Sequence, residues 1–260
     1  MFYKSKEETK MSAYQGFAYY YDELMEEAPY KEWVVWIEKT LTANEVTAPH
    51  LLDVGCGTGT IMTDLIKKGY RIDGVDASEE MLAVANEKMP KDQGSRLFCQ
   101  DMRELEGLGV FDTVIVTCDS LNYLLTKKDV EKAFASFYSH LKTGGLLLFD
   151  VHSLSYMEDE LAGFQFAESL ENRSCIWNCY NGEDPYSVEH ELTFFIKEED
   201  GRYRRFDEFH YQRTFSQQEY EDMLRAQGFK NVRVTADFTD QPPGQGSDRL
   251  FFTAIKKDLQ

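Results

Sequence analysis

Apolar and polar positions change their spacing along this chain, and the changes predict its elements. Between residues 49 and 151, short apolar runs such as LLDV, DTVIV and LLLFDV alternate with stretches of helical period. Continuous apolar runs are typical of strands covered on both faces, and their alternation with helices predicts a parallel sheet. The expected strands are 49–54, 71–76, 95–100, 111–117 and 145–151, and the expected helices between them are 58–68, 79–89 and 127–141.

After Ser153 the pattern changes, and apolar residues alternate with polar ones in part of the segment. Val188, His190, Leu192, Phe194 and Ile196 occupy every second position of a segment rich in aromatic and β-branched residues. This alternation predicts antiparallel strands with one wet face. Because such a segment is too long for a bare loop, we expect residues 161–215 to form a separate antiparallel β insertion of roughly three or four strands.

The two ends of the chain complete the expected organisation. Helices over 12–27 and 30–43 precede the first strand, and a helix over 216–227 precedes two terminal strands, 229–238 and 249–257. Ser216 and Glu219 form the pattern of a capping box at the start of that last helix. The predicted division is an N-terminal helical cap (1–46), a core (47–160 and 216–260) and the β insertion (161–215).

The segment LLDVGCGTG, at positions 51–59, is the strongest functional signal. A buried strand there runs into a glycine turn and then a helix, an arrangement that brings backbone N–H groups close to a ligand. Asp76 follows roughly 20 residues later, at the end of the second strand, where a carboxylate can accept hydrogen bonds from both ribose hydroxyls. The dinucleotide pattern G-x-G-x-x-G would need glycine at position 60, which is Thr60. The turn therefore favours an adenosine ligand over a dinucleotide.

Composition narrows the choice of partners. The 260 residues carry 28 Lys and Arg against 46 Asp and Glu, a net charge of −18, which disfavours nucleic acid or an anionic membrane as a partner. No segment approaches the ~20 apolar residues of a membrane span, and the N-terminus lacks the apolar centre of a signal peptide. Five cysteines are an odd number for a disulfide framework, and no Cys/His spacing suggests a metal. We expect a cytoplasmic protein without a metal, as a monomer or homodimer.

Several motifs in order resemble those of class I S-adenosylmethionine-dependent methyltransferases. They are LLDVGCGTG, Asp76, CQDM (99–102), FAYYYDELM (17–25), CDSLNYL (118–124), the DVHS after the fifth strand, and QRTFSQQEYEDML (212–224). As a set they are similar to the YqeM-like bacterial methyltransferases. The resemblance implies a Rossmann-like α/β fold with a seven-stranded sheet in the order 3-2-1-4-5-7-6. It also implies S-adenosylmethionine as cofactor, S-adenosylhomocysteine as product, and the β insertion as a lid over the substrate.

Ligands of such folds bind beyond the carboxyl ends of the strands, where many of the candidate residues fall. By resemblance, Asp53 orders the glycine loop near the cofactor's amino group, and Asp101 receives the adenine amino group. A purely structural role for Asp53, Asp101 or Met81 stays open, as does simple packing by Tyr14 and Tyr21. The candidate cofactor residues are Tyr14, Asp53, Gly55, Cys56, Gly57, Gly59, Asp76, Ala77, Met81, Asp101, Met102 and Asp119.

The remaining candidates concern the acceptor. His152, Asp119 and Tyr21 are the catalytic candidates, with His152 as the base if the acceptor arrives protonated. Asn122, His190, Tyr211 and Arg213 are the candidates for substrate binding. A solvated or packing role stays open for His152, His190, Tyr211 and Arg213. The expected reaction is methyl transfer by in-line displacement to N, O or C of a small molecule. An NAD-linked oxidoreductase and a non-catalytic module that binds S-adenosylmethionine remain as alternatives.

Overall fold

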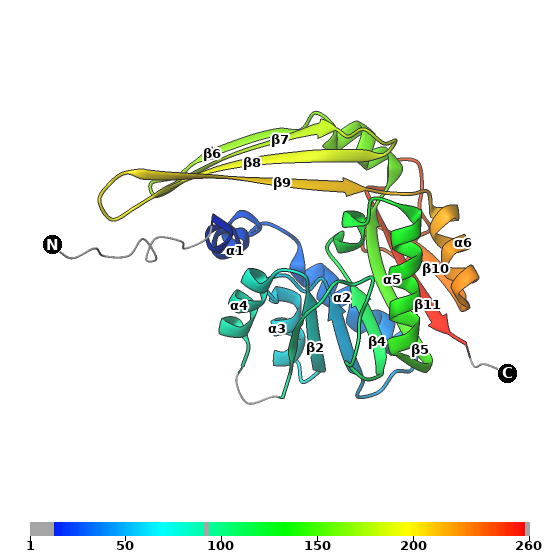
Figure 1. The fold of residues 1–260 in the computed structure, drawn as a ribbon. Coiled ribbons are helices and arrows are strands. Elements are labelled where there is room, and N and C mark those ends of the chain that lie inside the picture. Colours follow the sequence, from blue (N-terminus) through cyan, green and yellow to red (C-terminus); the bar gives the residue numbers. More distant parts are fainter. Residues whose placement is uncertain (1–12, 91–93, 258–260) are drawn as a thin grey trace.

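A seven-stranded sheet with helices on both faces forms the body of the molecule (Figure 1). The computed structural model describes residues 13–90 and 94–257. Five strands of the sheet are parallel: β1 (His50–Val54), β2 (Arg71–Asp76), β3 (Leu97–Cys99), β4 (Phe111–Val116) and β5 (Leu141–His152). At one edge, β11 (Arg249–Lys256) pairs antiparallel with both β5 and β10 (Phe229–Ala236).

The strand order is β10-β11-β5-β4-β1-β2-β3. Read from the other edge, this is the order 3-2-1-4-5-7-6 that the sequence predicts, so that prediction is confirmed. Several strands differ by a residue or two from their predicted bounds, and two differ more. β3 is shorter than 95–100, and β5 begins at Leu141, directly after helix α5, instead of at residue 145.

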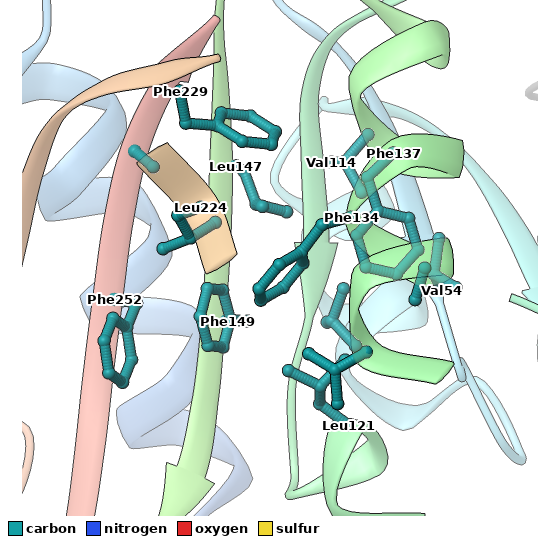
Figure 2. Close-up of a cluster of buried hydrophobic side chains, with 14 of the residues drawn as sticks. Val54, Val114, Leu121, Phe134, Phe137, Leu147, Phe149, Leu224, Phe229 and Phe252 are labelled. Carbon is teal, nitrogen blue, oxygen red and sulfur yellow. The ribbon is translucent and has the colours of Figure 1, made fainter. Parts of the chain in front are cut away.

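Helices cover both faces of this sheet and create two apolar layers. α2 (Tyr30–Ala43) and α3 (Thr60–Lys67) pack on one face, and α5 (Lys127–His140) and α6 (Gln217–Gln227) pack on the other. Figure 2 shows Phe134 and Phe137 of α5 beside Phe149 of β5, all fully buried. The ring of Phe149 stacks on that of Phe252, with centroids 4.6 Å apart. Each such side chain contributes about 1.5–3 kcal/mol on burial, which fixes the strands and hence the loops at their ends.

The predicted β insertion forms a second, four-stranded antiparallel sheet. Its strands are β6 (Gln165–Ser169), β7 (Arg173–Asn181), β8 (Ser187–Lys197) and β9 (Tyr203–Arg213), and it lies as a long arm above the core (Figure 1). The alternating residues of β8, from Val188 to Ile196, are buried, while those between them are only partly buried. One face of this second sheet is therefore apolar and turned inward.

Shorter elements fill the space between the two sheets. α1 (Ala13–Leu24) lies beneath the second sheet and beside α4 (Glu79–Lys88), and its Tyr20, Tyr21 and Leu24 pack against the apolar face of that sheet. The 3₁₀ turn η1 (Ser120–Tyr123) follows β4, and the π-helical turn η2 (Tyr156–Leu161) follows β5. Within the described ranges, no helix is long and apolar enough to cross a membrane.

Candidate active site

A cavity of about 1060 Å³ lies where the carboxyl ends of β1, β2, β4 and β5 face α1 and the second sheet. Strand β1 contributes Asp53, β2 contributes Asp76, and the segments after β4 and β5 contribute Asp119 and His152. These are the strand ends at which ligands of open α/β sheets bind. Of the predicted site residues, the cavity is lined by Tyr21, Asp53, Gly55, Cys56, Gly57, Asp76, Ala77, Met81, Asp101, Met102, Asp119, His152 and His190.

The glycine loop is bent tightly and tied to its neighbours. Gly55 has φ +73°, and a Cβ there would lie 2.7 Å from the Cβ of Ser120, so only glycine fits. Gly57 has φ +53°, and its N–H donates to Asp76 Oδ2 at 2.8 Å. Gly59 is different: it does not line the cavity, and a Cβ there would lie 3.0 Å from Ala85. It starts α3 and allows close packing against α4, which is a structural task.

Asp76 faces the cavity with both carboxylate oxygens already oriented. Oδ2 accepts from Gly57 N, and Oδ1 accepts from Ser78 N at 2.9 Å. Burial raises the pKa of Asp76, and these backbone donors act in the opposite direction. Each oxygen keeps a lone pair, so the carboxylate can accept two further hydrogen bonds, as a ribose diol requires.

Asp53 is a buried carboxyl group at the wall of the cavity. Its side chain is 2 % exposed, and Oδ1 has no hydrogen-bond partner among the residues that the structure describes. Burial and then the neighbouring Asp76 raise its pKa to about 7. An unpaired carboxyl oxygen at a cavity wall is costly unless a ligand satisfies it. A cationic donor such as the amino group of S-adenosylmethionine fits this position.

The segment after β3 is held by an ion pair. Arg103 binds the carboxylate of Asp101, with Nη2 at 2.5 Å from Oδ2, and this hydrogen bond lowers the pKa of Asp101. Met102 lines the same wall, and Met81 does so from the first turn of α4 while also packing against the second sheet. Tyr14 lies in α1, but its side chain falls outside the described part of the structure.

Asp119 lines the cavity and contacts three other side chains, those of His152, Arg249 and Gln212. Its Oδ1 lies 3.5 Å from His152 Nε2 and 3.0 Å from Arg249 Nη1. Its Oδ2 accepts from Gln212 Nε2 at 2.7 Å. Burial opposes ionisation, but His152, Arg249 and Gln212 together hold the pKa of Asp119 well below its usual range. Cys118 and Asp119 both adopt positive φ, 55° and 52°, a strained backbone of the kind found at functional sites.

Arg249 and Asp150 were not predicted from the sequence. Arg249 donates to Asp150 on β5, and Asp150 also accepts from Trp33 Nε1 at 2.8 Å and Cys118 N at 2.9 Å. The Asp150 side chain is fully buried. A single aspartate inside the apolar run LLLFDV is a signal that a buried charge needs a partner. The identity of that partner, which lies 99 residues away, is not visible in the sequence.

Three of the predicted substrate residues do not line the cavity. Tyr211 is 48 % exposed, because it lies on the outer face of β9 while its neighbours His210 and Gln212 line the cavity. The guanidinium of Arg213 binds the Leu125 carbonyl at 3.0 Å and the Asp184 carboxylate at 3.1 Å. Asn122 is fully buried and bonds only to backbone atoms among the described residues.

Tyr21 and His190 do line the cavity. Burial raises the pKa of Tyr21 well above its usual value, so its hydroxyl stays protonated. His190 is buried between Trp177 and Gln212 on the inner face of the second sheet. Burial lowers its pKa, and the imidazole is therefore neutral near pH 7.

The fold and this site define the class of the protein. The sequence pattern of the family described as "Methyltransferase domain" matches residues 51–145. A solved S-adenosylmethionine-dependent methyltransferase from Clostridium acetobutylicum ATCC 824 superposes with a TM-score of 0.82 at 26 % identity, covering 94 % of this chain and 99 % of that one.

Two proteins related in sequence narrow the family to which the chain is assigned. The chain is 48 % identical to the protein named "Putative methyltransferase YqeM" of Bacillus subtilis (strain 168), over 94 % of this chain and 97 % of the relative. It is 29 % identical, over 70 % of its length and 76 % of the relative, to the dTDP-3-amino-3,4,6-trideoxy-alpha-D-glucopyranose N,N-dimethyltransferase of Streptomyces venezuelae. The chain belongs to the S-adenosylmethionine-dependent methyltransferase family, and its cofactor is S-adenosylmethionine.

Proposed function

We propose that the protein transfers a methyl group to the nitrogen of a small-molecule amine. The observation that carries this proposal is one cavity that joins two sets of residues. The carboxyl groups of Asp53 and Asp76 line one part, and the Asp119–His152 pair lines the other, beneath the second sheet. Ligand pockets commonly occupy about 300–1,000 Å³. The volume here suits the cofactor together with a small acceptor.

Charge supports an amine as the acceptor. Both arginines that line the cavity are neutralised: Arg103 pairs with Asp101 and Asp129, and Arg249 pairs with Asp119 and Asp150. Asp76 and Glu80 also line the cavity, so its wall carries an excess of negative charge. Aromatic rings of Tyr21, Tyr30 and Tyr123 line it as well. Carboxylates and aromatic faces both attract a cation.

The related amino-sugar enzyme points the same way, because its name describes N,N-dimethylation of a sugar amine. Its relationship spans most of both chains. We extend to this protein the chemistry of the acceptor atom, an amine nitrogen, and leave the carbon skeleton of the acceptor to experiment.

His152 can accept the proton that a protonated amine must lose. With Nε2–H directed at Asp119, the lone pair is on Nδ1, a buried atom that has no partner within the described chain and that an acceptor entering the cavity would have to reach. The Asp119 carboxylate then stabilises the imidazolium that forms. S-adenosylmethionine supplies the methyl group. The amine lone pair forms the new N–C bond, the S–C pair stays on sulfur, and the proton passes from His152 to water.

The test is methyl transfer from labelled cofactor into pools of small amines, phenols, carboxylic acids, RNA and protein. We expect label in low-mass amines with release of S-adenosylhomocysteine. His152→Gln should lower the turnover number about a hundredfold or more, because general bases contribute about 10²–10⁴-fold, while cofactor affinity stays unchanged. Label that lands only in RNA or protein would contradict the proposal. Cofactor binding without any product in all pools would favour a non-catalytic binding module.

A further inference from the structure

Hydrogen bonds run without a gap from the second sheet to Asp119. Trp177 Nε1 on β7 donates to His190 Nδ1 on β8 at 3.1 Å. His190 Nε2 lies 3.2 Å from Gln212 Oε1 on β9, and Gln212 Nε2 donates to Asp119 Oδ2 at 2.7 Å. His190 and Gln212 are 6 % and 4 % exposed. Water therefore competes little with these bonds, and each orientation in the series is set by its neighbour.

The chemistry of each group fixes which partner donates in each hydrogen bond of this series. An indole N–H can only donate, so His190 Nδ1 must accept and Nε2 must carry the proton. That proton goes to Gln212 Oε1, which turns the amide N–H toward Asp119. An amide with the opposite orientation would place its oxygen against the ionised carboxylate. The hydrogen bonds within the second sheet thus orient the Gln212 amide so that its N–H group donates to Asp119.

The same end of β9 also holds the backbone of His152. Thr214 Oγ1 donates to the His152 carbonyl at 2.6 Å. Asn122 accepts from His152 N at 3.0 Å, and its amide N–H donates to the Arg213 carbonyl at 2.8 Å. Residues 212–214 therefore contact both members of the Asp119–His152 pair, one through a side chain and the other through its main chain.

We propose that Gln212 is a positioning residue for methyl transfer: held by His190, it fixes the Asp119 carboxylate against His152 and couples the second sheet to the acceptor site. This inference rests on the proposed function. Asn122 and Arg213, expected from the sequence to touch substrate, serve in this account to hold the end of β9 and His152 instead.

Two substitutions at position 212 separate electrostatic positioning from simple packing. Gln212→Leu removes the donor to Asp119 and should lower the turnover number about tenfold to a hundredfold, as expected for a hydrogen bond to a charged group. Gln212→Glu keeps the shape but sets a carboxylate against Asp119. We expect it to be slower than Gln212→Leu at pH 8 and to recover relative to it as the pH falls and the new carboxyl protonates. If Gln212 only filled space, Gln212→Glu would be faster than Gln212→Leu at pH 8, because glutamate keeps the shape of glutamine.

Affinity for S-adenosylhomocysteine should stay within about twofold in both variants, which also shows that they fold. Thr193→Val is the matched control, because it removes a hydrogen bond to Asp207 from the outer face of β8. It should leave turnover unchanged. Gln212→Leu at wild-type turnover, or Gln212→Glu faster than Gln212→Leu at pH 8, would overturn the proposal.

Nitrogen-15 NMR spectra of the His190 ring test the series of hydrogen bonds without an activity assay. We expect Nε2 protonated and Nδ1 unprotonated in the wild type; the opposite tautomer would overturn the proposal. If the wild type methylates no amine while this tautomer is found, the proposed function fails and the hydrogen-bond chain stands.

Discussion

The buried carboxyl group of Asp53 should lower the free energy of unfolding at neutral and higher pH. Because its folded pKa is raised to about 7 from 3.8, the folded state binds a proton more tightly than the unfolded state between these pH values. The free energy of unfolding therefore falls as the pH rises through that window. Asp53→Asn should remove this loss and be more stable than the wild type at pH 8. The gain is at most about 4 kcal/mol, since one pKa unit corresponds to about 1.4 kcal/mol.

The same substitution should weaken the binding of S-adenosylhomocysteine, because an amide cannot neutralise an ammonium group. Thermal unfolding across pH 4–8 and calorimetry measure the two effects. A variant that loses both stability and affinity at pH 8 would show that Asp53 only braces the loop.

Asp76 should dominate cofactor affinity. Asp76→Ala removes the acceptor for the ribose and the partner of Gly57 N, and we expect a loss of about 1.5–3 kcal/mol in binding. Calorimetry with S-adenosylhomocysteine measures this loss, with Asp64→Ala on the exposed side of α3 as control. An unchanged dissociation constant would show that Asp76 does not bind the cofactor.

Individual residues were predictable where they follow a parallel strand. Asp53, Asp76, Asp119 and His152 all lie in the cavity because the carboxyl ends of parallel strands meet at one edge. Arg249 and Gln212 could not be found this way, since they reach the site from antiparallel strands late in the chain. Tyr211 was misplaced by one position, which in a strand changes the face. Phe206 packs with Phe194 of β8, and every second residue of a strand points to the same face. Counting from Phe206 could therefore have indicated His210 and Gln212 instead.

At the level of elements, α1 is attached over the glycine loop by a polar cluster. Asp22 on α1 accepts from Thr58 Oγ1 at 2.5 Å and from Lys88 Nζ at 2.7 Å, and Lys88 also donates to Thr60 Oγ1 at 2.9 Å. The cluster joins the end of α1 to the start of α3 and the end of α4. Tyr21 and Leu24, beside Asp22, line the cavity. We infer that the position of α1 controls access to the part of the cavity next to the glycine loop.

Lys88→Met should therefore speed dissociation of S-adenosylhomocysteine several-fold, with a stability loss of about 1 kcal/mol or less because the ion pair is partly exposed. Stopped-flow displacement measures the rate. Lys67→Met, which breaks an exposed pair with Asp64, is the matched control and should change nothing. Equal rates in both variants would show that α1 does not limit release.

The elements themselves were predictable to within a few residues, because their periods and caps are local. The capping box of Ser216 and Glu219 is present, and β8 alternates as expected. How the second sheet lies over the cavity is not local. It depends on contacts such as Gln212 with Asp119, whose partners are 93 residues apart.

For the whole molecule, the net charge of −18 should act on the acceptor. A negative field raises the local concentration of cations, and salt screens it over about 10 Å at 0.1 M. We expect the specificity constant for a cationic amine to fall as ionic strength rises, while that for an uncharged analogue stays flat. Steady-state kinetics over a salt series measures both; equal salt dependence would exclude electrostatic attraction of the acceptor.

The most direct test of the account is calorimetric titration of the wild-type protein with S-adenosylhomocysteine and, separately, with NAD. The glycine loop, Asp53 and Asp76 predict saturable binding of the first at one site per chain and no heat with the second. Binding of NAD, or no heat with S-adenosylhomocysteine, would contradict the central claim that this cavity holds the methyl donor.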